Sequence, residues 1–173
     1  MEKVILVDEN DNELGTMEKM EAHEKALLHR AFSVFLFNEN GEMLLQKRAS
    51  SKYHSGGLWT NACCSHPRAG ERTIDAATRR LSEEMGINAN IEEIFSFVYK
   101  AELDKGLVEH EFDHVFFGQY EGEVDLNLDE ADDFKYISMD VLMNDVNENP
   151  GSYTEWFKIA LPKVKEHWLK VSN

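Results

Sequence analysis

The sequence is poor in the features that mark secreted and membrane proteins. It contains only two cysteines, Cys63 and Cys64, and adjacent cysteines make a poor disulfide framework but fit a reducing compartment. No stretch approaches the ~20 apolar residues that cross a bilayer. Residues 1–4 lack the basic region followed by an apolar stretch that begins a secretion signal. We therefore expect a cytoplasmic protein without a membrane partner.

Basic residues are scarce as well. The chain has 18 Lys and Arg against 33 Asp and Glu, a formal net charge of −15, which argues against a general nucleic-acid binder because polyanions would be repelled. An anionic ligand would need a local cluster of cations, and residues 47–52 form the densest basic patch. With 173 residues, 42% of them hydrophobic, and no repeats or flexible linkers, the chain fits one compact domain.

Strand and helix patterns interleave along the chain. Apolar residues at helical spacing over 73–85, followed by Gly86, predict a helix with a glycine stop, and Asn40-Gly41 between two apolar runs predicts a hairpin. Residues 47–58 are basic, polar and glycine-bearing, as is typical of a functional loop. Together these patterns predict an α/β (α+β) domain with mixed sheets and helices on the outside. The other expected strands lie at 4–7, 31–37, 42–46, 91–100 and 107–119, and the other expected helices at 17–28 and 138–146. Polar turns are expected at 8–15 and a polar stretch before 138. The amphipathic segment at 152–171 should be kinked or split by Pro162.

Two short segments carry side chains with metal-binding and acid–base chemistry. In a strand, residues two apart project from the same face. Glu109 and Glu111 should therefore point together, as should Cys64 and His66. If the two segments lie side by side, a thiol, an imidazole and two carboxylates come within reach of one another.

Each of these patterns has a purely structural alternative. A Glu-x-Glu strand more often faces solvent, but apolar residues at 112 and 115–117 indicate a core strand here. Buried acids need a partner, and a divalent metal is the economical one. A lone buried cysteine is usually an inert apolar side chain, and we keep that interpretation for Cys63.

The predicted helix carries a further pattern. Arg80, Glu83 and Glu84 lie three and four apart and share a face. Residues 79–87 resemble the end of the Nudix box, Arg-Glu-aliphatic-x-Glu-Glu-x-Gly-aliphatic, with Glu71 at the place of an earlier glutamate. The glutamates of that box hold Mg²⁺ against a diphosphate. Arg80 replaces the first of them, which suggests a site that holds a diphosphate without being equipped to hydrolyse it. A solvated Arg/Glu face is the structural alternative.

A resemblance to one family rests on two motifs. Residues 60–67 (Thr-Asn-Ala-Cys-Cys-Ser-His-Pro) and 108–113 (Val-Glu-His-Glu-Phe-Asp), together with Phe32-Ser33, residues 57–59 and the altered Nudix box, closely resemble the type I isopentenyl-diphosphate isomerases of the Nudix superfamily. The resemblance implies Nudix-like mixed β-sheets flanked by helices. It also implies three parts: an N-terminal strand and helix extension at 1–26 that contributes metal and diphosphate ligands, a catalytic domain at 27–160, and a C-terminal helix end at 161–173 within the same unit.

That family interconverts isopentenyl and dimethylallyl diphosphate by moving a double bond. An unactivated alkene is a very weak base, and its protonation gives a tertiary carbocation that water would quench. The reaction needs an acid on one face, a base on the other, and a dry pocket. The resemblance implies that Cys64 and Glu111 are this pair, that Tyr99 hydrogen-bonds to the acid, and that the π face of Trp156 stabilises the cation.

The resemblance also implies two metals. The ligands of the first are His23, His29, His66, Glu109 and Glu111, and Glu84 faces a Mg²⁺ that bridges to the diphosphate. Three nitrogens and two oxygens suit Mn²⁺ or Zn²⁺ better than Mg²⁺, and the sequence leaves the choice between them open. Because His23 and His29 are six apart, we expect His29 beyond the helix. No role is assigned to His54, His110, His114 or His167.

The diphosphate contacts implied by the resemblance are mostly cationic: Lys19, Arg48, Lys52 and Arg80, with Ser65 near the phosphate. We expect substrate to order the 47–58 loop and so exclude water. No nucleotide-binding glycine-rich turn is present, so we expect no flavin. We expect a monomer or weak dimer.

Two other functions fit parts of the pattern. A Nudix hydrolase acting on a nucleoside diphosphate would explain Glu83, Glu84 and Gly86, but not the thiol and paired glutamates. A non-enzymatic metal-binding module would show the paired spacing of structural zinc sites, which Cys-Cys-x-His lacks. The sequence leaves open which of Cys64 and Glu111 protonates the alkene and which direction the cell favours.

Overall fold

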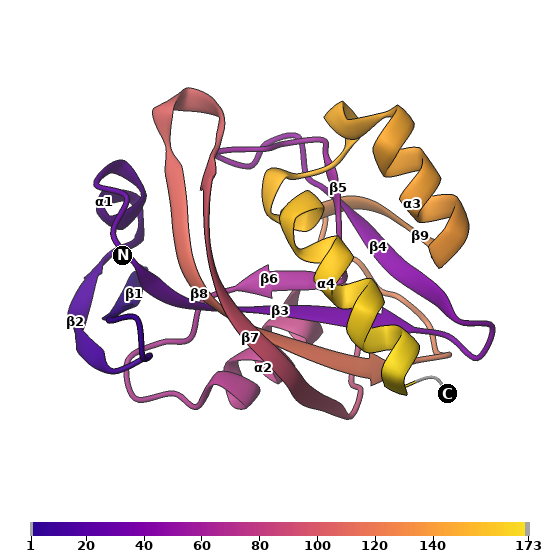
Figure 1. Cartoon of the computed structure of the whole chain (residues 1–173), viewed down its shortest axis with the longest axis horizontal. Coiled ribbons are helices and arrows are strands. Elements are labelled where there is room, and N and C mark those ends of the chain that lie inside the picture. The colour runs from indigo at the N-terminus through magenta and orange to yellow at the C-terminus, as the bar shows by residue number, and fades with distance from the viewer. Residues whose placement is uncertain (1, 172–173) are drawn as a thin grey trace.

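A computed structural model of the chain describes residues 2–171 as one mixed sheet of nine strands flanked by helices (Figure 1). The elements are β1 (Lys3–Val7), β2 (Glu13–Glu18), α1 (Lys19–Glu24), β3 (His29–Phe37), β4 (Glu42–Arg48), β5 (Trp59–Thr60), β6 (Cys63–Ser65), α2 (Thr73–Met85), β7 (Ile91–Glu102), β8 (Val108–Gln119), β9 (Ala131–Ser138), α3 (Met139–Glu148) and α4 (Glu155–Val171), with short 3₁₀ turns at Asp104–Gly106 and Pro150–Ser152. The predicted fold class, an α/β (α+β) domain with a mixed sheet flanked by helices, is thus confirmed.

Strand β3 is the centre of the sheet. One edge pairs in parallel with β8 from His29 to Phe37. The other edge is shared in succession by β1, β6 and β4, all antiparallel. Strand β7 pairs antiparallel with the far edge of β8, and β9 and β5 pair with β4. This order brings the N-terminal segment, the β6 motif and the β8 motif onto neighbouring strands.

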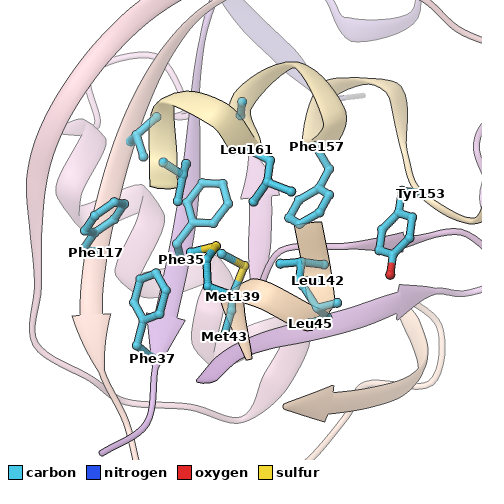
Figure 2. Packing of buried hydrophobic residues seen from close by; sticks show 13 residues of the cluster. Phe35, Phe37, Met43, Leu45, Phe117, Met139, Leu142, Tyr153, Phe157 and Leu161 are labelled. Atoms are coloured by element: carbon cyan, nitrogen blue, oxygen red, sulfur yellow. The ribbon is translucent and has the colours of Figure 1, made fainter. Parts of the chain in front are cut away.

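The two faces of the sheet carry two separate cores. Alternate residues of β3, β4 and β8 project to opposite sides, so that Phe35 and Phe37 pack with α3 and α4 while Val34 and Leu36 pack with α2. Figure 2 shows the first of these cores, in which Phe157 and Leu161 of α4 cover Phe35. Covering both faces buries the apolar strands on each side and leaves the strand ends for a site.

Several expected elements are confirmed closely. Helix α2 spans the predicted residues, and Gly86 ends it in the left-handed conformation at φ 64°. The hairpin at Asn40-Gly41 joins β3 to β4, with Gly41 at φ 74°. Strands β7 and β8 form the predicted long pair. His29 lies beyond α1 as the first residue of β3, as expected.

The N-terminal prediction is partly wrong. The expected polar turns at 8–15 and helix at 17–28 give way to strand β2 and the short α1. Strand β2 is largely exposed and, among the described strands, pairs with β1 alone, so no buried apolar alternation marks it. Ala26 at φ 56° takes the chain out of the helix, and the backbone N–H of Leu27 bonds back to Ala22. The chain can therefore turn directly into β3.

Near the C-terminus one prediction is wrong, and one alternative of another, the splitting of the last helix at Pro162, is also wrong. The polar stretch before 138 contains β9, whose charged residues sit at the outer edge against β4. Helix α4 is not split: it continues through the exposed Pro162, because buried residues before and after it, Phe157 and Val164, pack into the same core. The last two residues of the predicted 161–173 unit lie outside the described residues. Within 2–171, no helix combines the length and apolar character needed to cross a bilayer.

Candidate active site

Glu111 stands where three strands and a loop meet. It pairs in register with His29 of β3 on one side and Tyr99 of β7 on the other. Its Oε2 lies 2.8 Å from His66 Nε2 and 3.3 Å from His29 Nε2. The Tyr99 hydroxyl donates a hydrogen bond of 2.5 Å to Oε1. Sheet register therefore places two members of the first predicted ligand set, His29 and Glu111, directly opposite each other.

Helix α1 brings the third imidazole. The His23 ring centroid lies 5.2 Å from that of His29, and His23 Nδ1 is 2.7 Å from the carbonyl oxygen of Lys19. One donor atom each of His23, His29, His66 and Glu111 lies within 4.8 Å of the others, and all four residues are buried. The structure thus brings together residues from four separate segments.

Glu109 projects from the same face of β8 but belongs to an adjoining group. Its donor atom lies within 4.8 Å of donors of His23 and His54. Its Oε2 and His23 Nε2 are buried without a hydrogen-bond partner among the described residues. Buried polar atoms are normally paired, so these two atoms together with neutral imidazoles and carboxylates form a donor set that fits a divalent cation.

The surroundings of Glu109 and Glu111 shift the pKa values of the two carboxyl groups in opposite directions. Burial, reinforced by the neighbouring Glu111 charge, raises the pKa of Glu109 well above its usual value. Burial also opposes ionisation of Glu111, but hydrogen bonds from His29 and His66 outweigh it and hold the pKa of Glu111 well below its usual value. Glu111 is therefore the ionised member of the pair in the metal-free protein.

Three imidazoles of the site, those of His23, His54 and His66, are kept neutral. Burial lowers the pKa of His23 from 6.5 to about 4 and that of His54 to about 2, and it also lowers the pKa of His66. Neutral imidazole is the form that ligates metals. These three imidazoles are therefore ready to bind a cation at neutral pH.

The two adjacent cysteines face opposite sides of the sheet. Cys64 Sγ lies 3.0 Å from Asn61 Oδ1, to which its thiol can donate, and 3.4 Å from Ser33 Oγ, and burial raises the pKa of its thiol. Cys63 is fully buried in the α2 core, with Sγ 3.5 Å from Glu84 Oε2. Strand alternation therefore exposes one thiol to the site and encloses the other.

A cavity beside Glu111 is lined by the residues that are expected to contact the substrate. Cys64, Glu111 and Trp156 all line it. The remaining lining residues are Glu2, Lys19, Arg48, Lys52, Tyr53, His54, Ser65, His66, Arg80, Glu84, Glu109 and Glu130. Every residue expected to contact substrate is therefore on its wall. Of the other expected residues, His23, His29 and Tyr99 stand behind the wall and contact Glu111 or its neighbours.

The cationic side of the cavity is internally neutralised. Lys19 Nζ lies 3.0 Å from Glu2 Oε2, and Lys52 Nζ lies 2.7 Å from Glu130 Oε2. Glu130 Oε1 is also 3.3 Å from Arg80 NH2. Arg48 lies over the Trp156 ring, with its guanidinium carbon 5.0 Å from the ring centroid. Carboxylates of the chain therefore hold three of the four expected diphosphate cations.

Glu84 lies at the inner end of this cationic side. Its Oε2 accepts from Arg80 at 2.9 Å and its Oε1 from Gln46 at 3.1 Å. Burial raises its pKa despite the Arg80 charge. A carboxylate placed between a buried core and a cluster of cations can face a second cation brought in with a diphosphate.

Sequence reasoning missed four lining residues: Glu2, Tyr53, His54 and Glu130. Tyr53 and His54 lie in the loop predicted to be functional, so their position was a usable signal. Glu2 and Glu130 are two acids among many, and only pairing across the fold distinguishes them. His110 and His114 lie on the other face of β8, where His110 contacts the carbonyl of Ala26.

Solved structures share the fold. A protein from Deinococcus radiodurans superposes with a TM-score of 0.77 at 16% identity, covering 94% of this chain and 98% of that one. A MutT protein from Methanosarcina mazei Go1 superposes with a TM-score of 0.66 at 16% identity, covering 80% and 94%. At these identities the likeness concerns the fold alone.

Similarity in sequence is far closer. The NUDIX domain model matches residues 27–157. The isopentenyl-diphosphate Delta-isomerase 2 of Aromatoleum aromaticum is 52% identical, covering 94% of this chain and 86% of that protein. The isopentenyl-diphosphate Delta-isomerase of Serratia proteamaculans is 47% identical, covering 99% and 98%, and that of Pectobacterium atrosepticum 46%, covering 96% and 93%. The chain therefore belongs to the isopentenyl-diphosphate isomerases of the Nudix superfamily.

Proposed function

We propose that this isomerase moves the double bond of isopentenyl diphosphate to give dimethylallyl diphosphate, with Cys64 and Glu111 transferring the protons. The observation that supports these roles most directly is that both residues line one cavity, whose wall also carries four cations, Lys19, Arg48, Lys52 and Arg80. The alkene gains one proton at its terminal carbon and loses another from the allylic carbon, so the reaction changes neither the atom count nor the charge.

The two groups are suited to opposite parts of this exchange. Glu111 has one oxygen on Tyr99 and the other on two imidazoles. Burial keeps Tyr99 protonated by raising its pKa well above the usual value, so its hydroxyl remains a donor. Cys64 presents its thiol from β6, away from these contacts. An acid and a base on different strands can reach two different carbons of one small substrate molecule.

The diphosphate would bind on the cationic side. Lys19, Lys52 and Arg80 exchange their internal carboxylate partners for phosphate oxygens, Arg48 adds a fourth cation, and Ser65 offers a hydroxyl. Arginine grips phosphate in bidentate fashion, while lysine acts as a compact charge. The four cations offset the repulsion of an acidic protein. With the diphosphate so held, the hydrocarbon would lie toward Cys64 and Trp156, and the Trp156 ring would stabilise the cation.

The donor set supports a transition metal, Mn²⁺ or Zn²⁺, held by His23, His29, His66, Glu109 and Glu111, and Glu84 would face Mg²⁺ carried by the diphosphate. When bound, the first ion adds positive charge beside the paired glutamates and so alters their acidity. Residues 1–26 supply Lys19 and His23 to this site, in line with their proposed role as an extension of the catalytic domain at 27–160.

The direct test is incubation of purified protein with isopentenyl diphosphate in D₂O, with Mg²⁺ and either Mn²⁺ or Zn²⁺, followed by NMR of the product. We expect dimethylallyl diphosphate with deuterium in a methyl group. The same samples should release no phosphate, and a panel of nucleoside diphosphates should remain intact. Hydrolysis of those nucleotides at enzyme-like rates, without isomerisation, would instead identify a Nudix hydrolase.

A further inference from the structure

His54 lies beside the proposed metal ligands, and its signal in the sequence is its place in the loop at 47–58. It is only 4% exposed and lies on the cavity wall. Its ring centroid is 6.0 Å from that of His23 and 5.6 Å from the Trp156 ring. A buried imidazole at this place is either a packing residue under Trp156 or part of the metal site.

The grouping of donor atoms favours the metal site. Glu109 lies within 4.8 Å of donors of His23 and His54, whereas the group of His23, His29, His66 and Glu111 does not include it. A cation that Glu109 binds together with His23 therefore lies next to His54. Glu109 Oε2 and His23 Nε2 are both buried without a hydrogen-bond partner in the described part of the chain, and these are the two atoms that a shared cation would satisfy.

The loop fixes the His54 ring in place. His54 Nδ1 lies 3.1 Å from Ser55 Oγ, whereas His54 Nε2 forms no hydrogen bond within residues 2–171. Arg48 donates to the His54 carbonyl at 3.1 Å, and the backbone N–H of Ser55 donates to Asp104 at 3.0 Å. Ser55 adopts φ 55°, a conformation that persists in a non-glycine residue only when its surroundings impose it. These contacts leave Nε2 as the nitrogen available for a ligand.

We propose that His54 is a sixth ligand, through Nε2, of the same cation that His23, His29, His66, Glu109 and Glu111 hold. The proposal rests on the proposed five-residue site and extends it to four nitrogens and two oxygens. Six donors of this kind suit an octahedral ion such as Mn²⁺, whereas Zn²⁺ favours four or five ligands. His54 would thus bias the choice of metal that the other five residues leave open.

The wild-type protein itself can be tested by counting histidine ligands. Protein labelled with ¹⁵N in its imidazoles is loaded with ¹¹³Cd²⁺, and metal–nitrogen couplings are counted by NMR. Four coupled imidazoles, one of them assigned to His54, support the proposal. Three coupled imidazoles from His23, His29 and His66 overturn it while leaving the five-residue site intact. Absence of coupling to these three histidines overturns both.

A variant gives a second readout that does not depend on catalysis. In His54→Gln loaded with Co²⁺, we expect the weak visible absorption of an octahedral ion to intensify as the coordination number falls. Mn²⁺ affinity should fall by more than the roughly 10–100-fold that loss of an outer partner can cause. His110→Gln, on the same strand as Glu109 but on its other face, is the matched control. A Co²⁺ spectrum and Mn²⁺ affinity like those of the control would overturn the proposal, and the thermal unfolding of the metal-free variants shows that each is folded.

Discussion

Tyr99 and Glu111 lie directly opposite each other on β7 and β8, and the Tyr99 hydroxyl donates a hydrogen bond of 2.5 Å to Glu111 Oε1. The other carboxylate oxygen, Oε2, faces His29 and His66. One carboxylate thus joins the proposed metal ligands to the hydroxyl of Tyr99. This division of its two oxygens predicts separable effects on catalysis and on metal binding.

Tyr99→Phe should lower kcat without weakening metal binding. The substitution removes one hydrogen bond to an ionised group, which contributes about 1.5–3 kcal/mol, or roughly tenfold to 100-fold in rate. Because the ring stays in place, the KM for isopentenyl diphosphate and the affinity for Mn²⁺ should hold near wild-type values. Steady-state kinetics and metal titration measure both. A variant with wild-type kcat would show that the Tyr99 hydroxyl has no part in proton transfer.

The adjacent cysteines provide a matched pair of substitutions. Cys64→Ala should lower turnover by about 10²–10⁴-fold, the usual contribution of an acid–base group, while its far-UV and near-UV circular dichroism stay those of the wild type. Cys63→Ala should instead cost about 1 kcal/mol of unfolding free energy and reduce turnover much less, because Cys63 packs in the α2 core. Turnover near wild type in Cys64→Ala would refute the two-sided proton exchange.

Glu130 is predicted to compete with the diphosphate. It binds both Lys52 and Arg80 in the substrate-free protein, so Glu130→Gln frees these cations and removes one repulsive charge. We expect inorganic pyrophosphate to bind several-fold more tightly, as calorimetry would measure. Asp129→Asn makes the same charge change at the exposed neighbouring residue and should alter affinity little. Weaker binding by Glu130→Gln would mean that Glu130 orients the cations for substrate rather than masking them.

Acid should destabilise the metal-free protein through His23. Its folded pKa of about 4 lies below the unfolded value of 6.5, so between these values the unfolded chain binds a proton that the folded chain does not. Unfolding free energy contributed by His23 therefore decreases as the pH falls from 6.5 towards 4, by up to about 1.4 kcal/mol per pH unit. Other buried acids titrate too, so the quantity to measure is the difference between wild type and His23→Gln in urea with EDTA. A difference that stays constant with pH would contradict the prediction.

Local sequence patterns predicted those elements in which the spacing of apolar residues is visible within the element's own sequence. Helix α2 and its Gly86 end follow from helical spacing, and the common face of Glu109 and Glu111 follows from strand alternation. Strands β2 and β9 were missed because few of their residues are buried. Each gains strand geometry from pairing with a single neighbour, and such pairing leaves no apolar alternation in the strand's own sequence.

The sequence by itself determined which residues are candidates for the chemistry, because the motif around Cys64 and the Glu109–Glu111 pair set the residue types and the face each side chain shares. Only the tertiary structure decided how they meet. The pairing of β8 with both β3 and β7 places His29 and Tyr99 on the two sides of Glu111, and folding brings His54 and Glu130 to the same cavity. The physical reason is that register and loop packing depend on contacts between residues far apart in the chain, which no local pattern encodes.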